Sequence, residues 1–204
     1  VIGDNAVRKH SRGGGSTTVK AKYEITPLEG LQKRLGNSVK INFVPGYTIS
    51  KDFKAVNHSL IAEAVKTAAS ADAVILFGGL NHESGNDCEG EDKPNMKLPY
   101  GQDELIKAVL KANPNTVIVM IAGSPVEMGS WIQDAKALVY TSYLGMETGT
   151  ALAEVLTGDV NPSGKLTYTI PVKLEDSPSF VLGEYPGKNG KVTYLDDLMV
   201  GYRY

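Results

Sequence analysis

The sequence predicts an α/β fold, namely a mostly parallel, doubly wound sheet with helices on both faces (an α/β sandwich). Three apolar runs rich in Val, Ile and Tyr have the character of buried strands, at residues 73–78, 116–122 and 137–143. The first two show little of the alternation of a half-exposed strand, as expected for parallel strands covered on both faces. Helical patterns fall between the strands, and this alternation is typical of parallel α/β folds.

Two further segments are predicted as strands. Residues 39–44 alternate more strongly and are expected in the same mainly parallel sheet as the three apolar runs. Residues 165–170 alternate cleanly, with Leu166, Tyr168 and Ile170 on one face, which suits an edge strand.

Four helices are predicted from their end signals and apolar stripes. The first begins at a capping box, residues 26–29 (Thr-Pro-Leu-Glu), with Pro at the first helical position. The second and third have apolar stripes over residues 60–68 and 105–110. The fourth has its stripe over residues 151–156, and Gly158 is its expected C-cap.

The composition is that of an ordinary globular protein, with 42% apolar and 22% charged residues. The formal net charge is −2, and no run of Lys and Arg offers a nucleic-acid footprint, so no nucleic-acid partner is expected. No apolar stretch approaches the ~20 residues that span a bilayer, so no membrane partner is expected. The sole cysteine, Cys88, excludes an internal disulfide.

The start of the chain has the pattern of the last residues of a strand and its turn, Val1-Ile2-Gly3. There is neither an initiator Met nor a signal-peptide pattern. We therefore expect residues 1–204 to form one domain of a larger protein, and this end of the chain does not predict localisation.

Two loops follow strands and are predicted to carry the function, because ligands bind beyond the carboxyl ends of strands in doubly wound sheets. Residues 4–19 follow the opening strand, and residues 79–100 follow the strand at 73–78. The second loop has ~20 residues without periodicity, and a loop of that length in a compact domain is usually functional or disordered.

The first loop contains a glycine-rich segment, residues 12–18, in which Ser16 follows three glycines. Glycine-rich turns after a first strand often cradle phosphates, because bare backbone N–H groups can approach closely. Here no Gly-x-Gly-x-x-Gly leads from strand to helix, and no Lys precedes the Ser/Thr. A tight or flexible turn, a nucleotide site, and close approach to another ligand with Ser16 as a hydroxyl contact stay open.

The second loop is strongly acidic, with Asp87, Glu89, Glu91 and Asp92 inside six residues. Calcium binding is one interpretation, but Asp92 stands where the helix–loop–helix calcium loop needs its invariant Gly. General acid–base chemistry is another, in which a mobile carboxyl group is brought to a reacting centre. From the residues alone, a solvated loop, a catalytic carboxyl and a metal site remain as alternatives.

Other residues are weaker candidates. The histidines, His10, His58 and His82, are scattered, and a lone histidine is more often a surface or capping residue than a ligand. Ser124 does not sit in the Gly-x-Ser-x-Gly of a nucleophile elbow. The counts of Cys and His make a zinc-type site a poor candidate.

Several motifs along the chain are similar to those of one known family. Residues 87–106 resemble the pattern in which a Glu-Gly-x-Asp-Arg loop leads into a Leu-Pro…Gln helix, and residues 3–6 resemble a Gly-Pro-Asn-Ala turn. Residues 158–166 are similar to Gly-Asp-x-Asn-Pro-Ser-Gly-Lys/Arg-Leu, and residues 200–204 to the end of the same domain. Each motif is weak alone, but together they run in order over nearly the whole chain, which therefore resembles the second, C-terminal domain of glycoside hydrolase family 3.

The resemblance implies a retaining β-glycosidase, most often a β-glucosidase acting on terminal β-linked glucose, with no cofactor and no metal. A preceding (β/α)₈-barrel domain, outside this chain, would hold the sugar and supply an aspartate nucleophile. By motif position Glu89 is the acid/base residue, and Ser16 matches a serine that contacts the sugar in some members. The resemblance implies a periplasmic or secreted protein and leaves a cytoplasmic one open.

Two alternatives accompany this interpretation. Within the family, the sugar could be xylose, because the residues that read it lie in the barrel. From another class, the chain could be a non-catalytic doubly wound module that binds a nucleotide or another small molecule at residues 13–16.

The chain departs from the family pattern at three positions: Lys93 replaces Arg, Asp4 replaces Pro, and Cys88 replaces a small or hydroxyl residue. Lys93 keeps the charge but loses the planar fork of Arg, so bidentate support of the loop is not expected.

A proton donor must hold its proton at working pH. Crowding by the neighbouring carboxylates therefore predicts a raised pKa for Glu89. Retaining glycosidases also need two carboxyl groups ~5–5.5 Å apart, and the sequence offers no motif for the second.

Overall fold

The computed structural model describes residues 1–199 except 83–84, 91–92 and 185–186. Its strands and α-helices are, in chain order, α1 (Pro27–Leu35), α2 (His58–Ala69), β1 (Val74–Gly79), α3 (Gln102–Ala112), β2 (Thr116–Ile121), β3 (Ala137–Thr141), α4 (Thr148–Thr157) and α5 (Pro178–Val181). Short 3₁₀ helices are η1 (Asp4–Ala6), η2 (Gly15–Thr17), η3 (Gly36–Ser38), η4 (Ile132–Asp134), η5 (Gly145–Glu147) and η6 (Leu174–Asp176).

The three strands predicted from the apolar runs form one parallel sheet in the order β1-β2-β3. The prediction of burial is wrong for β3, because Ala137 is exposed and the other residues of this strand are only half-buried. The opening segment continues the sheet beyond β1, because Ile2 forms parallel bridges with both Leu76 and Val44. The N–H of Ile2 donates to the carbonyl of Ile75 at 2.9 Å, and the N–H of Phe77 donates to the carbonyl of Ile2 at 2.8 Å. The three strands and the two bridges of Ile2 are therefore all parallel, and their carboxyl ends share one edge.

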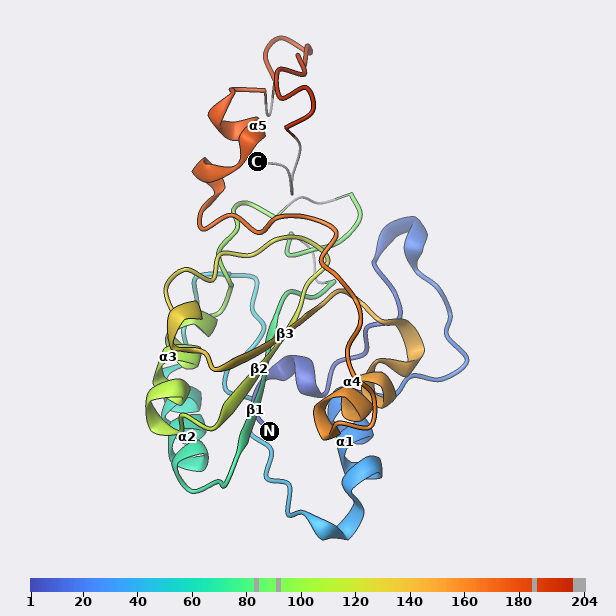
Figure 1. The fold of residues 1–204 in the computed structure, drawn as a ribbon, viewed down its shortest axis with the longest axis vertical. Coiled ribbons are helices and arrows are strands. Elements are labelled where there is room, and N and C mark those ends of the chain that lie inside the picture. The colour runs from blue at the N-terminus through green and yellow to red at the C-terminus, as the bar shows by residue number, and fades with distance from the viewer. Residues whose placement is uncertain (83–84, 91–92, 185–186, 200–204) are drawn as a thin grey trace.

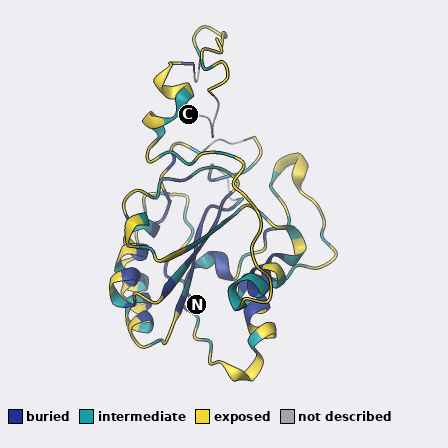
Figure 2. Ribbon diagram, viewed as in Figure 1, coloured by how far each residue is buried: buried dark blue, intermediate teal, exposed yellow. Residues whose placement is uncertain are grey.

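Helices cover both faces of the sheet, which confirms the doubly wound α/β fold (Figure 1). Successive residues of β2 point to opposite sides: Ile118 packs in the core under α2 and α3, and Val119 packs in the core under α1 and α4. The buried residues gather in β1 and β2 and on the inward faces of these four helices (Figure 2). A strand covered on both sides is apolar throughout, so β2 lacks alternation.

The predicted ends of two helices are confirmed. The hydroxyl of Thr26 accepts the N–H of Glu29, and the carboxylate of Glu29 accepts the N–H of Thr26 at 2.8 Å, which completes the capping box of α1. These hydrogen bonds from Thr26 lower the pKa of Glu29. Gly158 ends α4 in the left-handed region at φ 81°, where glycine has no steric cost.

The prediction of a strand over residues 39–44 is wrong except at its last residue. Only Val44 is bridged, and Val39, at the other end of the segment, is 48% exposed. The opening segment is the neighbour of residues 39–44 in the sheet, and it forms a bridge to them only between Ile2 and Val44.

The edge strand predicted over residues 165–170 is also wrong, since the segment is irregular. Leu166 is 55% exposed, so the apolar face that its alternation implied is not packed against the sheet.

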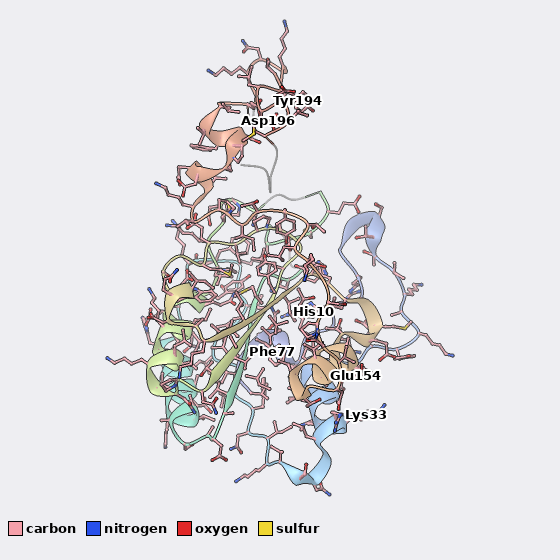
Figure 3. All side chains as sticks on the ribbon, in the orientation of Figure 1. His10, Lys33, Phe77, Glu154, Tyr194 and Asp196 are labelled. Carbon is pink, nitrogen blue, oxygen red and sulfur yellow. The ribbon has the colours of Figure 1, made fainter. Side chains whose placement is uncertain are left out.

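The C-terminal segment extends away from the sheet, and α5 lies in it (Figure 1). Tyr194 and Asp196 lie out in this segment, whereas Phe77 of β1 lies inside the body (Figure 3). Residues 200–204, which the sequence matched to the end of the domain, lie outside the described residues. Within the described part of the chain, none of the helices has the length and apolar character needed to cross a membrane.

Helices α1 and α4 approach each other through two glycines. A Cβ on Gly30 of α1 would lie 2.0 Å from the carbonyl oxygen of Gly149, and a Cβ on Gly149 would lie 2.0 Å from the carbonyl oxygen of Thr26. Both obstructions are backbone atoms, so neither can be relieved by a rotamer change. The close packing of these two helices therefore depends on the absence of side chains here.

We predict that Gly30→Ala destabilises the protein. Helix propensity alone favours Ala over Gly by about 1 kcal/mol, whereas forcing atoms into a packed interface typically costs about 1–3 kcal/mol or more. Urea denaturation should therefore give a lower free energy of unfolding. The matched control is Gly164→Ala, where a Cβ would meet no atom within 4 Å, and it should be near neutral. A stabilised Gly30→Ala variant would contradict the close approach.

Candidate active site

The two loops predicted to carry function meet at the carboxyl edge of the sheet. The hydroxyl of Ser16, on η2, donates to the carboxylate of Glu89, with distances of 2.5 Å to Oε1 and 2.7 Å to Oε2. The backbone N–H of Thr17 donates to Oε2 at 3.2 Å, and the N–H of Glu89 donates to the carbonyl of Gly13 at 3.3 Å. The predicted site residues Glu89 and Ser16 are therefore in direct contact.

Glycine is favoured where η2 receives the carboxylate. Gly15 has φ 52°, and a Cβ on it would lie 2.6 Å from Oε2 of Glu89. The glycine-rich segment thus lets a backbone turn approach a carboxylate closely. In this structure the Ser16 hydroxyl and the Thr17 N–H of this turn both donate to Glu89.

The electrostatics of Glu89 are opposite to the sequence prediction. Its carboxylate is exposed, and hydrogen bonds from the Ser16 hydroxyl, then from the N–H groups of Ser16 and Thr17, lower its pKa below the ordinary value of 4.5. A hydrogen-bond donor that stabilises the charged carboxylate lowers the pKa of the carboxyl group. The prediction of a raised pKa from crowding is therefore wrong for this structure.

Asp87, one of the three carboxylates expected to crowd Glu89, is bound by other residues. Its Oδ2 accepts the N–H of Gly123 at 2.7 Å and the hydroxyl of Tyr143 at 2.6 Å, and its Oδ1 accepts the hydroxyl of Ser124 at 2.8 Å. Gly123 and Ser124 follow β2, and Tyr143 follows β3, so Asp87 ties the loop after β1 to the ends of both other strands. The other two crowding residues of the prediction, at 91 and 92, lie outside the described residues.

Lys93 gives the loop a second attachment. Its half-buried ammonium donates to the carbonyl of Pro125, and burial lowers its pKa. A single carbonyl needs only one donor, so this contact does not require the bidentate fork that Arg would offer. Asp87 and Lys93 thus anchor the loop to the same segment after β2, on either side of Glu89.

Two side chains fix the base of the site. The amide of Gln102, at the start of α3, donates to the carbonyl of Gly79 at 2.9 Å and accepts the N–H of Gly79 at 2.8 Å. The amide of Asn5, on η1, donates to the carbonyls of Gly78 and Leu80 at 3.0 and 3.2 Å. These contacts give physical roles to the Gln and Asn of the two motifs found in the sequence.

The neighbouring Gly3 and Asp4 also have defined roles. Gly3 has φ 113°, and a Cβ on it would lie 1.9 Å from the carbonyl oxygen of Phe77, so only glycine fits between the opening segment and β1. Asp4, where the family pattern has Pro, accepts a hydrogen bond from Arg8 at 2.6 Å.

Sequence reasoning missed two histidines of this site. His10 is 2% exposed and stacks on Tyr143 with ring centroids 5.6 Å apart, and His82 lies against the same ring at 3.8 Å. Figure 3 shows His10 within the body of the molecule rather than on its surface. Burial lowers the pKa of His10 to about 4, so it is neutral at neutral pH. The sequence signal that could have identified His10 and His82 as site residues was their position in the two loops at residues 4–19 and 79–100.

Among the residues that the structure describes, no group of three or more His, Cys, Asp or Glu side chains is arranged to hold a metal ion. What the arrangement does offer is an exposed carboxylate on an anchored loop, beside hydroxyl and N–H donors. A carboxyl group so presented can exchange a proton with a bound molecule.

Comparison with known proteins identifies the class of domain. The family description "Glycosyl hydrolase family 3 C-terminal domain" matches residues 1–202, and the chain therefore belongs to glycoside hydrolase family 3. The match confirms the resemblance found in the motifs.

Particular relatives support this assignment. The chain is 42% identical to a β-glucosidase of Bacteroides ovatus, and the match covers all of this chain and 28% of that protein. The structure superposes on a family 3 β-glucosidase of Bifidobacterium adolescentis with a TM-score of 0.85 and 38% identity, over all of this chain and 28% of the other. It also matches a Kluyveromyces marxianus β-glucosidase solved in complex with glucose, with a TM-score of 0.88 and 25% identity. This match covers 100% of this chain and 42% of the other. The chain thus spans less than half the length of these relatives.

We predict that Ser16→Ala raises the pKa of Glu89 toward 4.5. In the native protein the folded pKa is below the unfolded one, so the stabilisation from this contact is present above the unfolded pKa and is lost as pH falls through the folded pKa. Carboxyl ¹³C chemical shifts of Glu89, followed against pH by NMR, measure both variants. A wild-type value at or above 4.5, or one that Ser16→Ala leaves unchanged, would contradict the contact.

Proposed function

We propose that this chain is the α/β sandwich domain of a retaining β-glucosidase and contributes Glu89 as the acid/base residue of a site shared with a barrel domain. The observation that carries the proposal is the exposed carboxylate of Glu89 on an anchored loop at the carboxyl edge of the sheet, in a chain of this family. The relatives named β-glucosidase support glucose as the sugar.

The reaction explains why the domain presents a carboxyl group without a catalytic partner. Retaining hydrolysis needs a nucleophile on one side of the scissile bond and a proton donor on the other, ~5–5.5 Å apart. Glu89 protonates the leaving oxygen while the nucleophile, in the barrel domain, forms a glycosyl-enzyme. The same carboxylate then takes a proton from the water that releases the sugar.

The lowered pKa of Glu89 fits this role once the barrel is considered. A surface carboxylate that holds hydrogen bonds from Ser16 and Thr17 favours its charged form. Under a barrel domain, burial and the negative charge of the nucleophile raise the pKa. When Ser16 donates to the sugar instead, Glu89 loses its strongest donor, and its pKa rises further toward that of a proton donor.

We predict that the 204-residue chain alone does not measurably hydrolyse an aryl β-glucoside. One carboxyl group without its partner and without a sugar pocket lacks both positioning and covalent catalysis. Release of the aryl alcohol, measured on purified chain free of host glycosidases, tests this. Robust turnover would mean that the nucleophile lies in this chain and that the site is misassigned.

The decisive variant is Glu89→Ala in the intact protein that contains this chain. General acid catalysis is typically worth about 10²–10⁴-fold, so the loss should be of this size for an alkyl glucoside or a disaccharide, whose leaving group needs a proton. An activated aryl glucoside should lose less, because its leaving group departs as an anion. Azide should partly restore turnover and give a product of retained β configuration.

The matched control is Glu91→Ala, two residues away, which should show neither the leaving-group dependence nor the rescue. If Glu89→Ala slows every substrate equally and azide has no effect, Glu89 is not the acid/base residue. Parallel assays with an aryl β-xyloside decide between the two sugars. Higher kcat/KM for the xyloside would replace glucose by xylose in this proposal and leave Glu89 in its role.

A further inference from the structure

The carboxylate of Asp87 is partly buried and is bound by residues that follow two other strands, although nothing in the proposed reaction uses it. It accepts three hydrogen bonds of 2.6–2.8 Å, from Tyr143, Gly123 and Ser124. All three donors are fixed by the sheet, because they follow the carboxyl ends of β2 and β3. Asp87 therefore joins the loop that leaves β1 to the segments that follow β2 and β3.

The surroundings of Asp87 are shaped for this contact. Gly123 carries no side chain, and a Cβ there would lie 2.9 Å from Oδ2 of Asp87 and 2.8 Å from the ring of Tyr143. The Tyr143 ring is held in turn by His10 and His82, whose rings lie 5.6 and 3.8 Å from it. The ring nitrogen Nδ1 of His82 also lies 3.2 Å from the backbone carbonyl of Asp87.

Glu89 is only two residues from this anchor. An extended chain spans at most about 3.6 Å per residue, so the backbone of Glu89 stays within roughly 7 Å of that of Asp87. On the other side, Lys93 attaches the loop to Pro125. Misplacement of a catalytic group by 1 Å can cost about 10²-fold in rate, so the accuracy of this anchor bears on catalysis.

We propose that Asp87 is a positioning residue, which fixes the reach and direction of Glu89 by binding Gly123, Ser124 and Tyr143. This inference rests on the proposed role of Glu89 as proton donor and adds a residue that acts through it. Asp87 itself touches no substrate in this assignment.

Two substitutions of Asp87 separate positioning from charge. Asp87→Asn keeps the shape: its amide oxygen can accept from Gly123 and Tyr143, and its NH₂ can donate to the hydroxyl of Ser124, which also accepts. Asp87→Ala removes all three contacts. If Asp87 acts by positioning Glu89, the Asp87→Asn variant should keep most of the activity that Asp87→Ala loses.

The kinetic test uses the intact protein, with turnover expressed per active site. Asp87→Ala should lower kcat for an alkyl glucoside about 10²-fold, lower it much less for an activated aryl glucoside, and change KM little, since the misplaced group is the proton donor. Asp87→Asn should stay within about 10-fold of wild type. Equal losses on both substrates, or an Asn variant no better than Ala, would overturn the inference.

Tyr143→Phe is a second variant in case Asp87→Ala fails to fold. It removes one of the two donors to Oδ2 and leaves the ring in its stack. A smaller loss with the same leaving-group dependence supports the inference, and unchanged kinetics on the alkyl glucoside counts against it.

A measurement without turnover keeps this inference separable from the proposed function. In the 204-residue chain, Asp87→Ala should release the loop from Ser16, so that Glu89 titrates closer to 4.5 by NMR, while Asp87→Asn keeps the native value. An unchanged titration in Asp87→Ala means that Asp87 does not position Glu89.

If Glu89→Ala shows leaving-group dependence and Asp87→Ala does not, the proposed function stands and this inference fails. If Glu89→Ala shows none, the proposed function fails, and the titration still reports on the anchor.

Discussion

The site depends on one constraint of the sheet: its strands are parallel, so their carboxyl ends meet at one edge. The opening segment, β1, β2 and β3 each deliver a loop to that edge. Residues far apart in the chain, such as Ser16, Glu89 and Tyr143, come together only for this reason. In an antiparallel sheet successive loops would alternate between edges, and the contacts described above could not form.

The structure places two carboxylates of the loop after β1 in different environments. Asp87 is partly buried and satisfied by fixed donors, whereas Glu89 is exposed and held by a hydroxyl and by N–H groups of a neighbouring turn. The first environment fixes the loop, and the second leaves a carboxyl group available. A rigid support beneath an accessible group is what a proton donor needs when its partner is contributed by another domain.

The sequence predicted most of the fold because the relevant signals are local or periodic. The capping box at Thr26 and Glu29 satisfies backbone groups within one turn, and an apolar run such as β2 reflects burial on both faces. The alternation around Leu166 was misleading, because periodicity says which residues share a face but not whether anything covers it.

The candidate site was predicted in its residues but not in its contacts. Motif order pointed to Ser16 and Glu89, and the shared sheet edge explains why they meet. The shift in the pKa of Glu89 was predicted upward, whereas the structure gives a downward shift caused by hydrogen bonds. The prediction took closeness in sequence for closeness in space, but Asp87 binds Tyr143. That anchor involves three strand ends, so no single segment of the sequence contains a signal for it.

We propose that this domain presents Glu89 to the leaving oxygen of a glucoside bound in a barrel domain, and a crystal structure of the intact protein with a non-hydrolysable β-glucoside would decide this. We expect a Glu89 carboxyl oxygen roughly 2.6–3.2 Å from the glycosidic heteroatom and a second carboxyl group across the anomeric carbon, ~5–5.5 Å from Glu89. A different carboxyl group at the glycosidic atom, with Glu89 directed away from the sugar, would rule out this role for Glu89.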